Sequence, residues 1–312
     1  MSTTTQILAR STTDVAMTVT RAHARATVSS SPTRLGRPWL PRLAAVLAGG
    51  LASALLLQPA TAAESAAARE EFVPQVGQPG KDVVWVPTPE ALVDTMLNLA
   101  DLKPGEYLVD LGSGDGRTVI AAAKRGARAR GIEYNPNMVE LAKRNAEREG
   151  VSDRATFEQG DLFQKDFSDA DVITLFLLPS LNERLRPVLL EMRPGVRVVS
   201  NSFGMGNWEP DRRVSIDGSE CRSWCSALLW IVPARVQGTW EIDGKPLILE
   251  QEFQKISGTL DGKPLEGRLQ GAQIEFSVDD VQYKGTVDGK AMRGERSGGQ
   301  SGSWQAVART GS

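Results

Sequence analysis

Apolar and polar positions along the middle of the chain follow two alternating patterns, which together predict a parallel sheet flanked by helices. Five short apolar runs are predicted strands, at 107–111, 129–133, 155–158, 171–178 and 196–200. Four segments have helical apolar spacing, at 89–102, 115–125, 135–149 and 180–192. The run at 171–178 is apolar throughout, as expected of a central strand that is covered on both faces. Because strand and helix alternate, we expect an α/β fold with a doubly wound sheet, and a late strand at 226–232 against one edge.

The pattern changes after residue 234, where short alternating segments are separated by glycines. Three Asp-Gly pairs, at 243–244, 261–262 and 288–289, are strong signals for β-hairpin turns. Residues 235–312 are therefore predicted to form a small all-β domain. Two similar tripeptides, Gly238-Thr-Trp240 and Gly302-Ser-Trp304, stand near its ends, which suggests that its first and last strands pair.

The N-terminal segment resembles a targeting sequence. Leu43–Leu57 is a run of apolar and small residues, preceded by three arginines and followed by Ala60-Thr-Ala-Ala63. This order is typical of a secretory signal peptide, and roughly 15 apolar residues are short for a membrane span of about 20. An uncleaved membrane anchor and a mitochondrial-type presequence are the alternatives. We expect residues 1–63 to be a signal or anchor, 64–87 to be a proline-punctuated linker, and the protein to be exported or membrane-anchored. A domain facing the cytoplasm is the alternative location.

Composition excludes several kinds of chemistry. The one histidine is His23, so the folded body has no Ser-His-Asp triad and no histidine metal ligand. Two cysteines, Cys221 and Cys225, are too few for a four-thiolate zinc site, and no metal site is expected. They are too far apart for a disulfide in an extended segment and within reach in a turn, so both states stay open. Residues 64–312 carry 30 basic and 37 acidic side chains, which does not favour nucleic acid as a partner.

The strongest motif is Asp110-Leu-Gly-Ser-Gly-Asp-Gly-Arg117, where a predicted strand turns into a predicted helix. Glycines there let the backbone approach a ligand, and the helix N-terminus offers free N–H groups. The spacing is not the dinucleotide-binding G-x-G-x-x-G, because Arg117 stands where its third glycine would be. Two further acidic residues follow the next two strands, Glu133 and Asp161.

These three elements resemble the cofactor site of the class I, seven-strand, Rossmann-like methyltransferases, which use S-adenosylmethionine (SAM). The resemblance implies a SAM-dependent methyltransferase domain over 88–234, and its expected cofactor-binding residues are Thr88, Asp110, Gly112, Ser113, Gly114, Gly116, Arg117, Glu133, Tyr134, Asn135, Asp161 and Leu162. An ordered set of segments narrows the resemblance, namely 86–89, 110–117, 175–182 and 193–200. They are similar to the small protein-lysine methyltransferases that modify the mitochondrial adenine nucleotide translocase and the c-ring protein of ATP synthase.

The narrower resemblance implies N-methylation of a lysine in a protein acceptor, which we expect to be small or membrane-associated. Leu178, Pro179 and Asn182 are the expected acceptor-binding residues, and no catalytic residue is assigned. Three tryptophans, 208, 224 and 230, are candidates either for a substrate channel or for packing. Two alternatives stay open: a SAM-dependent methyltransferase of small molecules or lipids, and a non-catalytic exported binding protein on a methyltransferase scaffold.

Overall fold

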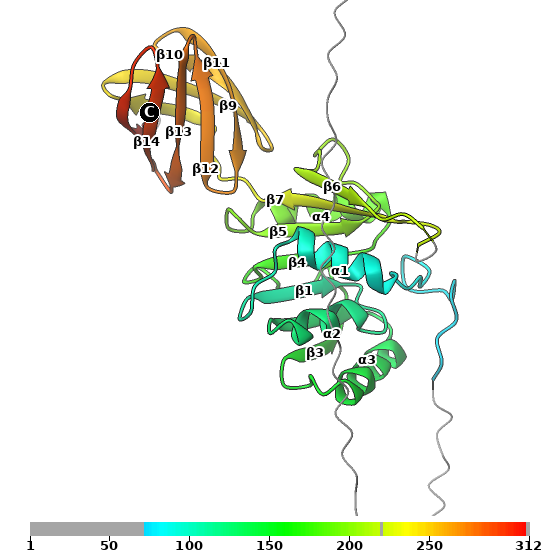
Figure 1. The fold of residues 1–312 in the computed structure, drawn as a ribbon. Coiled ribbons are helices and arrows are strands. Elements are labelled where there is room, and N and C mark those ends of the chain that lie inside the picture. Colours follow the sequence, from blue (N-terminus) through cyan, green and yellow to red (C-terminus); the bar gives the residue numbers. More distant parts are fainter. Residues whose placement is uncertain (1–71, 219–220, 310–312) are drawn as a thin grey trace, which may run out of the picture. The chain divides into compact units, whose positions relative to one another are not determined.

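The computed structural model describes residues 72–218 and 221–309 (Figure 1). The predicted signal or anchor segment lies outside these residues. Within the described ranges, no helix combines the length and the apolar character that a membrane crossing requires.

The predicted doubly wound sheet is confirmed, with seven strands in the order β3-β2-β1-β4-β5-β7-β6. The strands are β1 (Tyr107–Leu111), β2 (Arg128–Glu133), β3 (Ala155–Gln159), β4 (Val172–Leu175), β5 (Arg197–Asn201), β6 (Arg212–Ser215) and β7 (Ser226–Ile231). The first five are mutually parallel, and β7 is antiparallel to β5 and β6. The carboxyl ends of β1, β2, β3, β4 and β5 therefore lie along one edge of the sheet, where α/β proteins place their ligand sites.

Helices cover both faces of this sheet, which explains why its central strands are continuously apolar. The helices are α1 (Glu90–Leu99), α2 (Arg117–Lys124), α3 (Pro136–Arg148) and α4 (Pro179–Leu190). Leu108 of β1 shares a buried cluster with residues of α1, α2 and α3. Its neighbour Val109 shares a second buried cluster with Leu185 and Leu189 of α4. Successive side chains of a strand point to opposite faces, so one apolar run serves two cores.

The far edge of the sheet differs from the prediction. The segment around 226–232 does form a strand, β7, but it lies between β5 and β6 instead of at the edge. The edge strand β6 was not predicted from the sequence. All four of its residues are exposed, so it has no buried face to produce an alternating pattern.

The predicted all-β domain is a closed eight-strand barrel in the order β10-β11-β12-β13-β14-β15-β8-β9. Its strands are β8 (Gly238–Ile242), β9 (Lys245–Glu252), β10 (Lys255–Leu260), β11 (Lys263–Gln270), β12 (Gln273–Val278), β13 (Val281–Asp288), β14 (Ala291–Gly298) and β15 (Gly302–Ala308). The expected pairing of first and last strands is confirmed, with Ala308 opposite Trp240. Asp243 and Asp261 adopt positive φ angles of 51° and 52° before their glycines, as two-residue hairpin turns of type I′ require. Side chains of alternate residues fill the interior, including Phe276, Tyr283 and Trp304.

Candidate active site

A cavity of about 550 Å³ lies at the carboxyl ends of the central strands. Its floor consists of the glycine-rich loop after β1 and the residues that follow β2, β3 and β4. A short hairpin before α1, residues 77–85, contributes a further part of its wall. The hairpin is held by backbone hydrogen bonds, in which Gly77 N–H donates to Trp85 O at 2.8 Å and Trp85 N–H to Gln78 O at 2.9 Å. Twelve of the fifteen predicted site residues line this cavity; Gly116, Pro179 and Asn182 do not.

Two glycines of the motif have different roles. Gly114 has φ +53°, and a Cβ built on it would lie 2.7 Å from Trp85 Nε1 of the hairpin. Gly116 begins α2 with φ +83°, and its Cβ would lie 2.7 Å from the Phe157 ring and 2.9 Å from Ala142 Cβ. The prediction that Gly116 contacts the cofactor is therefore corrected, because its missing side chain allows α2 to pack against β3 and α3. Gly114 is the position where the loop backbone is exposed to the cavity.

The Asp110 carboxyl group ends β1 and is buried, with 7% of the residue exposed. Its Oδ1 accepts a hydrogen bond from Thr174 Oγ1 at 2.7 Å. Burial raises the pKa of Asp110 from 3.8 to about 7, the Thr174 hydrogen bond opposes this, and Glu133 and Asp115 add to the increase. The carboxyl group is therefore divided between its neutral and charged forms near neutral pH.

Glu133 at the end of β2 connects two loops of the site. Its Oε2 accepts a hydrogen bond from Gly114 N–H at 3.0 Å, and its Oε1 accepts one from Asn135 N–H at 2.9 Å. Asn135 in turn caps α3, since its Oδ1 accepts a hydrogen bond from Asn137 N–H at 2.9 Å. Tyr134 lies between them and is half exposed. This carboxylate thus holds the glycine-rich loop against the start of α3.

Asp161 and Leu162 follow β3 at the opposite side of the cavity. One Asp161 oxygen accepts a hydrogen bond from Phe163 N–H at 3.0 Å, and the other forms a 2.7 Å ion pair with Lys81 of the hairpin. The Lys81 hydrogen bond is the main reason why the pKa of Asp161 lies below its ordinary value. Lys81 Nζ also lies 5.1 Å from the centre of the Tyr134 ring. The hairpin is therefore anchored across the cavity by a charged contact.

Arg117 and Thr88 form the base of the hairpin side. Arg117 makes a bidentate pair with Asp115, and its Nη1 donates to Thr88 O at 2.9 Å. Thr88 Oγ1 accepts a hydrogen bond from Asn201 Nδ2 at 3.3 Å. Thr88 thus connects the hairpin to the end of β5, and its predicted place at the cavity is confirmed by the lining residues.

The acceptor side agrees only in part with the prediction. Leu178 lines the cavity and is 44% exposed. Pro179 instead provides the first residue of α4. Asn182 is completely buried, and its Nδ2 donates to the carbonyl oxygens of Phe203 and Gly204 at 3.2 and 3.1 Å. The expectation that Asn182 contacts a ligand is therefore corrected: its amide holds the loop that follows β5.

Several lining residues were missed in the sequence. Phe176 and Leu177 belong to the apolar run that was predicted as a strand to residue 178, but β4 ends at Leu175 and the rest of the run becomes cavity wall. Phe203 and Trp224 lie in loops that no periodic pattern marks. Of the three candidate tryptophans, Trp224 lines the cavity and is 45% exposed, whereas the other two are buried in the core. For the hairpin, Pro79-Gly80 was the available turn signal.

The wall residues fit SAM, the cofactor that the sequence resemblance implied. Five acidic and two basic side chains line the cavity, which favours a cationic ligand such as a sulfonium. Carboxylates at the ends of β1 and β2 are hydrogen-bond acceptors for hydroxyl and ammonium groups. Gly114 leaves the loop backbone free of a side chain where a ligand must approach closely.

Comparison with known proteins gives consistent matches over the same part of the chain. A family model described as the ANTKMT methyltransferase domain matches residues 110–212. A protein-lysine N-methyltransferase of Saccharolobus islandicus is 41% identical over 138 residues, covering 43% of this chain and 86% of that protein. A Rattus norvegicus lysine N-methyltransferase, named for the c-type protein of ATP synthase, is 35% identical over 148 residues, covering 45% of this chain and 68% of that protein. The crystal structure of an RNA methyltransferase from Salinibacter ruber with S-adenosyl-L-homocysteine is 49% identical, covers 48% of this chain and 96% of that one, and has a TM-score of 0.45.

The matched residues 110–212 contain the glycine-rich loop and both acidic residues that follow β2 and β3. They also contain β4 and β5, whose ends form the other wall of the cavity. From the seven-strand sheet, the site at its carboxyl edge and these relatives, the chain belongs to the class I SAM-dependent methyltransferases, in the family of protein-lysine N-methyltransferases.

Proposed function

We propose that this protein transfers a methyl group from SAM to the ε-amine of a lysine in a protein acceptor. The observation that carries the proposal is the 41% identity to a protein-lysine N-methyltransferase of which the match covers 86%. The apolar wall formed by Leu177, Leu178 and Leu181 supports it. A lysine amine must lose its proton before it attacks, and a weakly polar environment lowers the pKa of an amine.

Each part of the cavity has a proposed task in this reaction. The loop at Gly114 and the carboxylates of Asp110 and Glu133 bind the amino-acid and ribose parts of the cofactor, and the segment at Asp161 and Leu162 contacts its adenine. Bound SAM supplies a methyl group on a sulfonium, an activated carbon for in-line displacement. The chain contributes by holding the amine in line and excluding water, because positioning provides much of the rate of such a transfer.

Calorimetric titration of SAM into the full-length protein tests the cofactor site. We expect binding in the micromolar range and a marked loss of affinity in Asp110→Ala. Val307→Ala is a matched control, because Val307 lies on β15 of the barrel and is 59% exposed. A well-folded wild-type protein that does not bind SAM would overturn the proposed function.

Transfer of labelled methyl groups from SAM into a cell extract tests the acceptor. The extract comes from a host strain that lacks this protein, and is afterwards separated into protein, RNA and lipid or small-molecule fractions. We expect label in protein, recovered as methyl-lysine after acid hydrolysis. Label confined to RNA, or to lipids and small molecules, would contradict the proposal.

The location proposed for this enzyme is outside the cytoplasm or anchored at the membrane. The proposal rests on the basic and apolar segment at 34–63 and on the Cys221–Cys225 disulfide, since disulfides persist mainly in oxidising compartments. A membrane-associated acceptor suits this location. Cell fractionation, with N-terminal sequencing of the mature protein, tests it; an intact N-terminus in the cytosolic fraction would contradict it.

A further inference from the structure

The cavity has two sides of different chemistry. All seven of its charged lining residues belong to the hairpin, the glycine-rich loop, or the segments after β2 and β3. The seven lining residues contributed by β4 and the segments that follow it are all apolar, namely Leu175, Phe176, Leu177, Leu178, Leu181, Phe203 and Trp224. The charged side suits the cofactor, so the apolar side is the part left for the acceptor.

Three aromatic rings form the outer part of the apolar side. Phe176 follows β4, Phe203 follows β5, and Trp224 precedes β7. The rings of Phe176 and Phe203 are stacked, with centroids 5.9 Å apart and planes 18° apart. The Trp224 ring is tilted by 60° against Phe176, with a centroid distance of 6.0 Å. We call these three residues the aromatic cluster.

The aromatic cluster is open to solvent at the Trp224 end. Trp224 is 45% exposed and nearby Leu178 is 44% exposed, whereas Leu177 is buried. A side chain that enters from solvent would therefore pass the aromatic cluster before it reaches the interior. Aromatic faces attract cationic amines, and their edges and faces also pack against an aliphatic stem.

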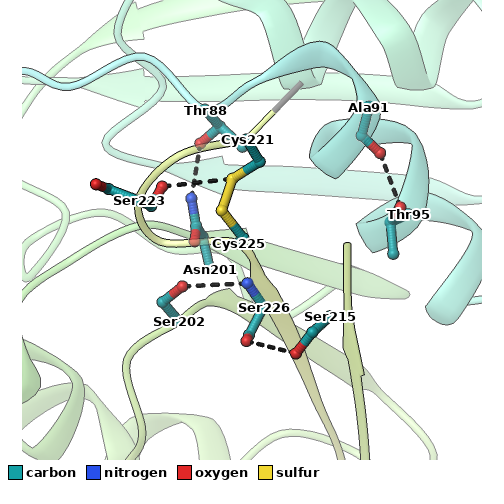
Figure 2. The surroundings of a disulfide bond; sticks show 10 residues. All are labelled: Thr88, Ala91, Thr95, Asn201, Ser202, Ser215, Cys221, Ser223, Cys225 and Ser226. Carbon is teal, nitrogen blue, oxygen red and sulfur yellow. Dashed lines mark hydrogen bonds between the residues drawn. A yellow bond between two sulfur atoms is a disulfide. The ribbon is translucent and has the colours of Figure 1, made fainter. Parts of the chain in front are cut away.

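A disulfide holds the loop that carries Trp224 (Figure 2). Cys221 and Cys225 are four positions apart and their Cα atoms are 5.7 Å apart. Between them, Trp224 adopts φ +57°, a region that bulky side chains rarely occupy. Figure 2 shows the disulfide beside Thr88 and Asn201, which hydrogen bond to each other below the loop. Backbone outliers of this kind persist when the surrounding structure enforces them, and they are concentrated at functional sites.

The loop is also tied to the strands beside the cavity. Cys225 O accepts a hydrogen bond from Ile216 N–H at 2.9 Å, and Ser226 O accepts one from Ser202 N–H at 2.7 Å. Ser202 is the residue before Phe203 in the chain. These bonds connect the disulfide loop to the segment that carries a second member of the aromatic cluster.

We infer that the aromatic cluster is the entrance channel for the acceptor amine, and that the Cys221–Cys225 disulfide keeps Trp224 in position as its outer wall. This inference rests on the proposed lysine methylation. Trp224 then acts as a specificity-determining residue: it selects an unbranched aliphatic amine through its ring, and takes no part in cofactor binding. Opening the disulfide would free the loop and weaken acceptor binding while leaving the cofactor side intact.

Acceptor kinetics measured beside SAM affinity test the inference on the full-length protein. We expect Trp224→Ala to raise the KM for the protein acceptor by about tenfold, the size expected for a lost cation–aromatic contact with its packing. SAM affinity should stay at the wild-type value, and Trp224→Phe should restore most of the loss. The double variant Cys221→Ser/Cys225→Ser should raise KM in the same direction. Val307→Ala is the control that should change nothing. Phe203→Leu provides a second channel variant if Trp224→Ala fails to fold.

A binding measurement separates failure of this inference from failure of the proposed function. Broadening of the NMR signals of n-butylamine, which copies the stem and amine of lysine, reports binding without turnover in protein saturated with S-adenosylhomocysteine. We expect broadening in the wild type and its loss in Trp224→Ala. If wild type labels protein but the Trp224 variants keep wild-type KM and broadening, the channel is wrong and the function stands. If wild type labels no protein, the function is wrong, and n-butylamine binding decides the channel separately. A Trp224→Ala variant that loses SAM affinity as strongly as acceptor binding would also overturn the channel.

Discussion

The buried carboxyl group of Asp110 makes the stability of the methyltransferase unit depend on pH in a specific direction. Its pKa is about 7 in the folded protein against 3.8 for the ordinary residue. Below pH 3.8 the group is neutral in both the folded and the unfolded chain, and it costs nothing. Above that value the unfolded chain ionises first, so the free energy of unfolding falls as pH rises towards 7. Asp110→Asn removes this titration.

The size of the effect follows from the two pKa values. At about 1.36 kcal/mol for each tenfold change in proton affinity, the separation between 3.8 and about 7 corresponds to about 4 kcal/mol. An asparagine at this position keeps an oxygen that accepts the hydrogen bond from Thr174. We therefore expect Asp110→Asn to be more stable than wild type near neutral pH by up to about 4 kcal/mol, with the advantage vanishing towards pH 4.

Urea unfolding followed by the helical circular dichroism signal is a suitable assay. All four described α-helices lie between Glu90 and Leu190, so this signal reports on the methyltransferase unit and not on the barrel. The quantity to compare is the difference in the free energy of unfolding between variant and wild type at several pH values. A difference that stays constant from pH 4 to pH 8, whatever its size, would refute the burial argument for Asp110.

Three further predictions concern the cofactor side of the cavity. Gly114→Val should abolish SAM binding in calorimetry, because its Cβ would lie 2.7 Å from Trp85 Nε1 and its φ of +53° is strained for valine; unchanged affinity would remove Gly114 from the site. Lys81→Met should weaken SAM binding by up to about fivefold, the scale of one exposed ion pair, because the hairpin loses its bridge to Asp161; a faster release in stopped-flow measurements is the expected cause, and an unchanged release rate would show that the bridge does not close the cavity. SAM binding to wild type near pH 6.5 should release protons, because a bound cation favours ionised Asp110 and lowers its pKa; calorimetry in two buffers of different ionisation enthalpy measures the release, and equal release by Asp110→Asn would contradict it.

The sheet and the cofactor side of the site could be predicted because their signals are local. A strand covered on both faces must be apolar at every position, and the run at 172–175 shows this without any tertiary information. Asp110 and Glu133 end strands that lie side by side in the sheet, with Asp110 directly opposite Gly131 of β2. Since neighbouring parallel strands end at one edge, the order of motifs in the chain was enough to bring these carboxylates together. In the barrel, Asp-Gly pairs specify their turns through the positive φ angles that they tolerate.

The acceptor side was decided only by tertiary structure. Trp224, Phe203 and Phe176 come from three separate segments, and nothing in their local sequence distinguishes a channel ring from a core ring. Whether Cys221 and Cys225 pair depended on the turn between them, because the same spacing in a strand would separate them beyond bonding distance. Asn182 turned inward because the loop after β5 offers carbonyl oxygens to its amide. The sequence alone therefore determined the sheet, the order of its strands' motifs and the cofactor chemistry, whereas long-range packing determined which side chains meet at the place where the acceptor must enter.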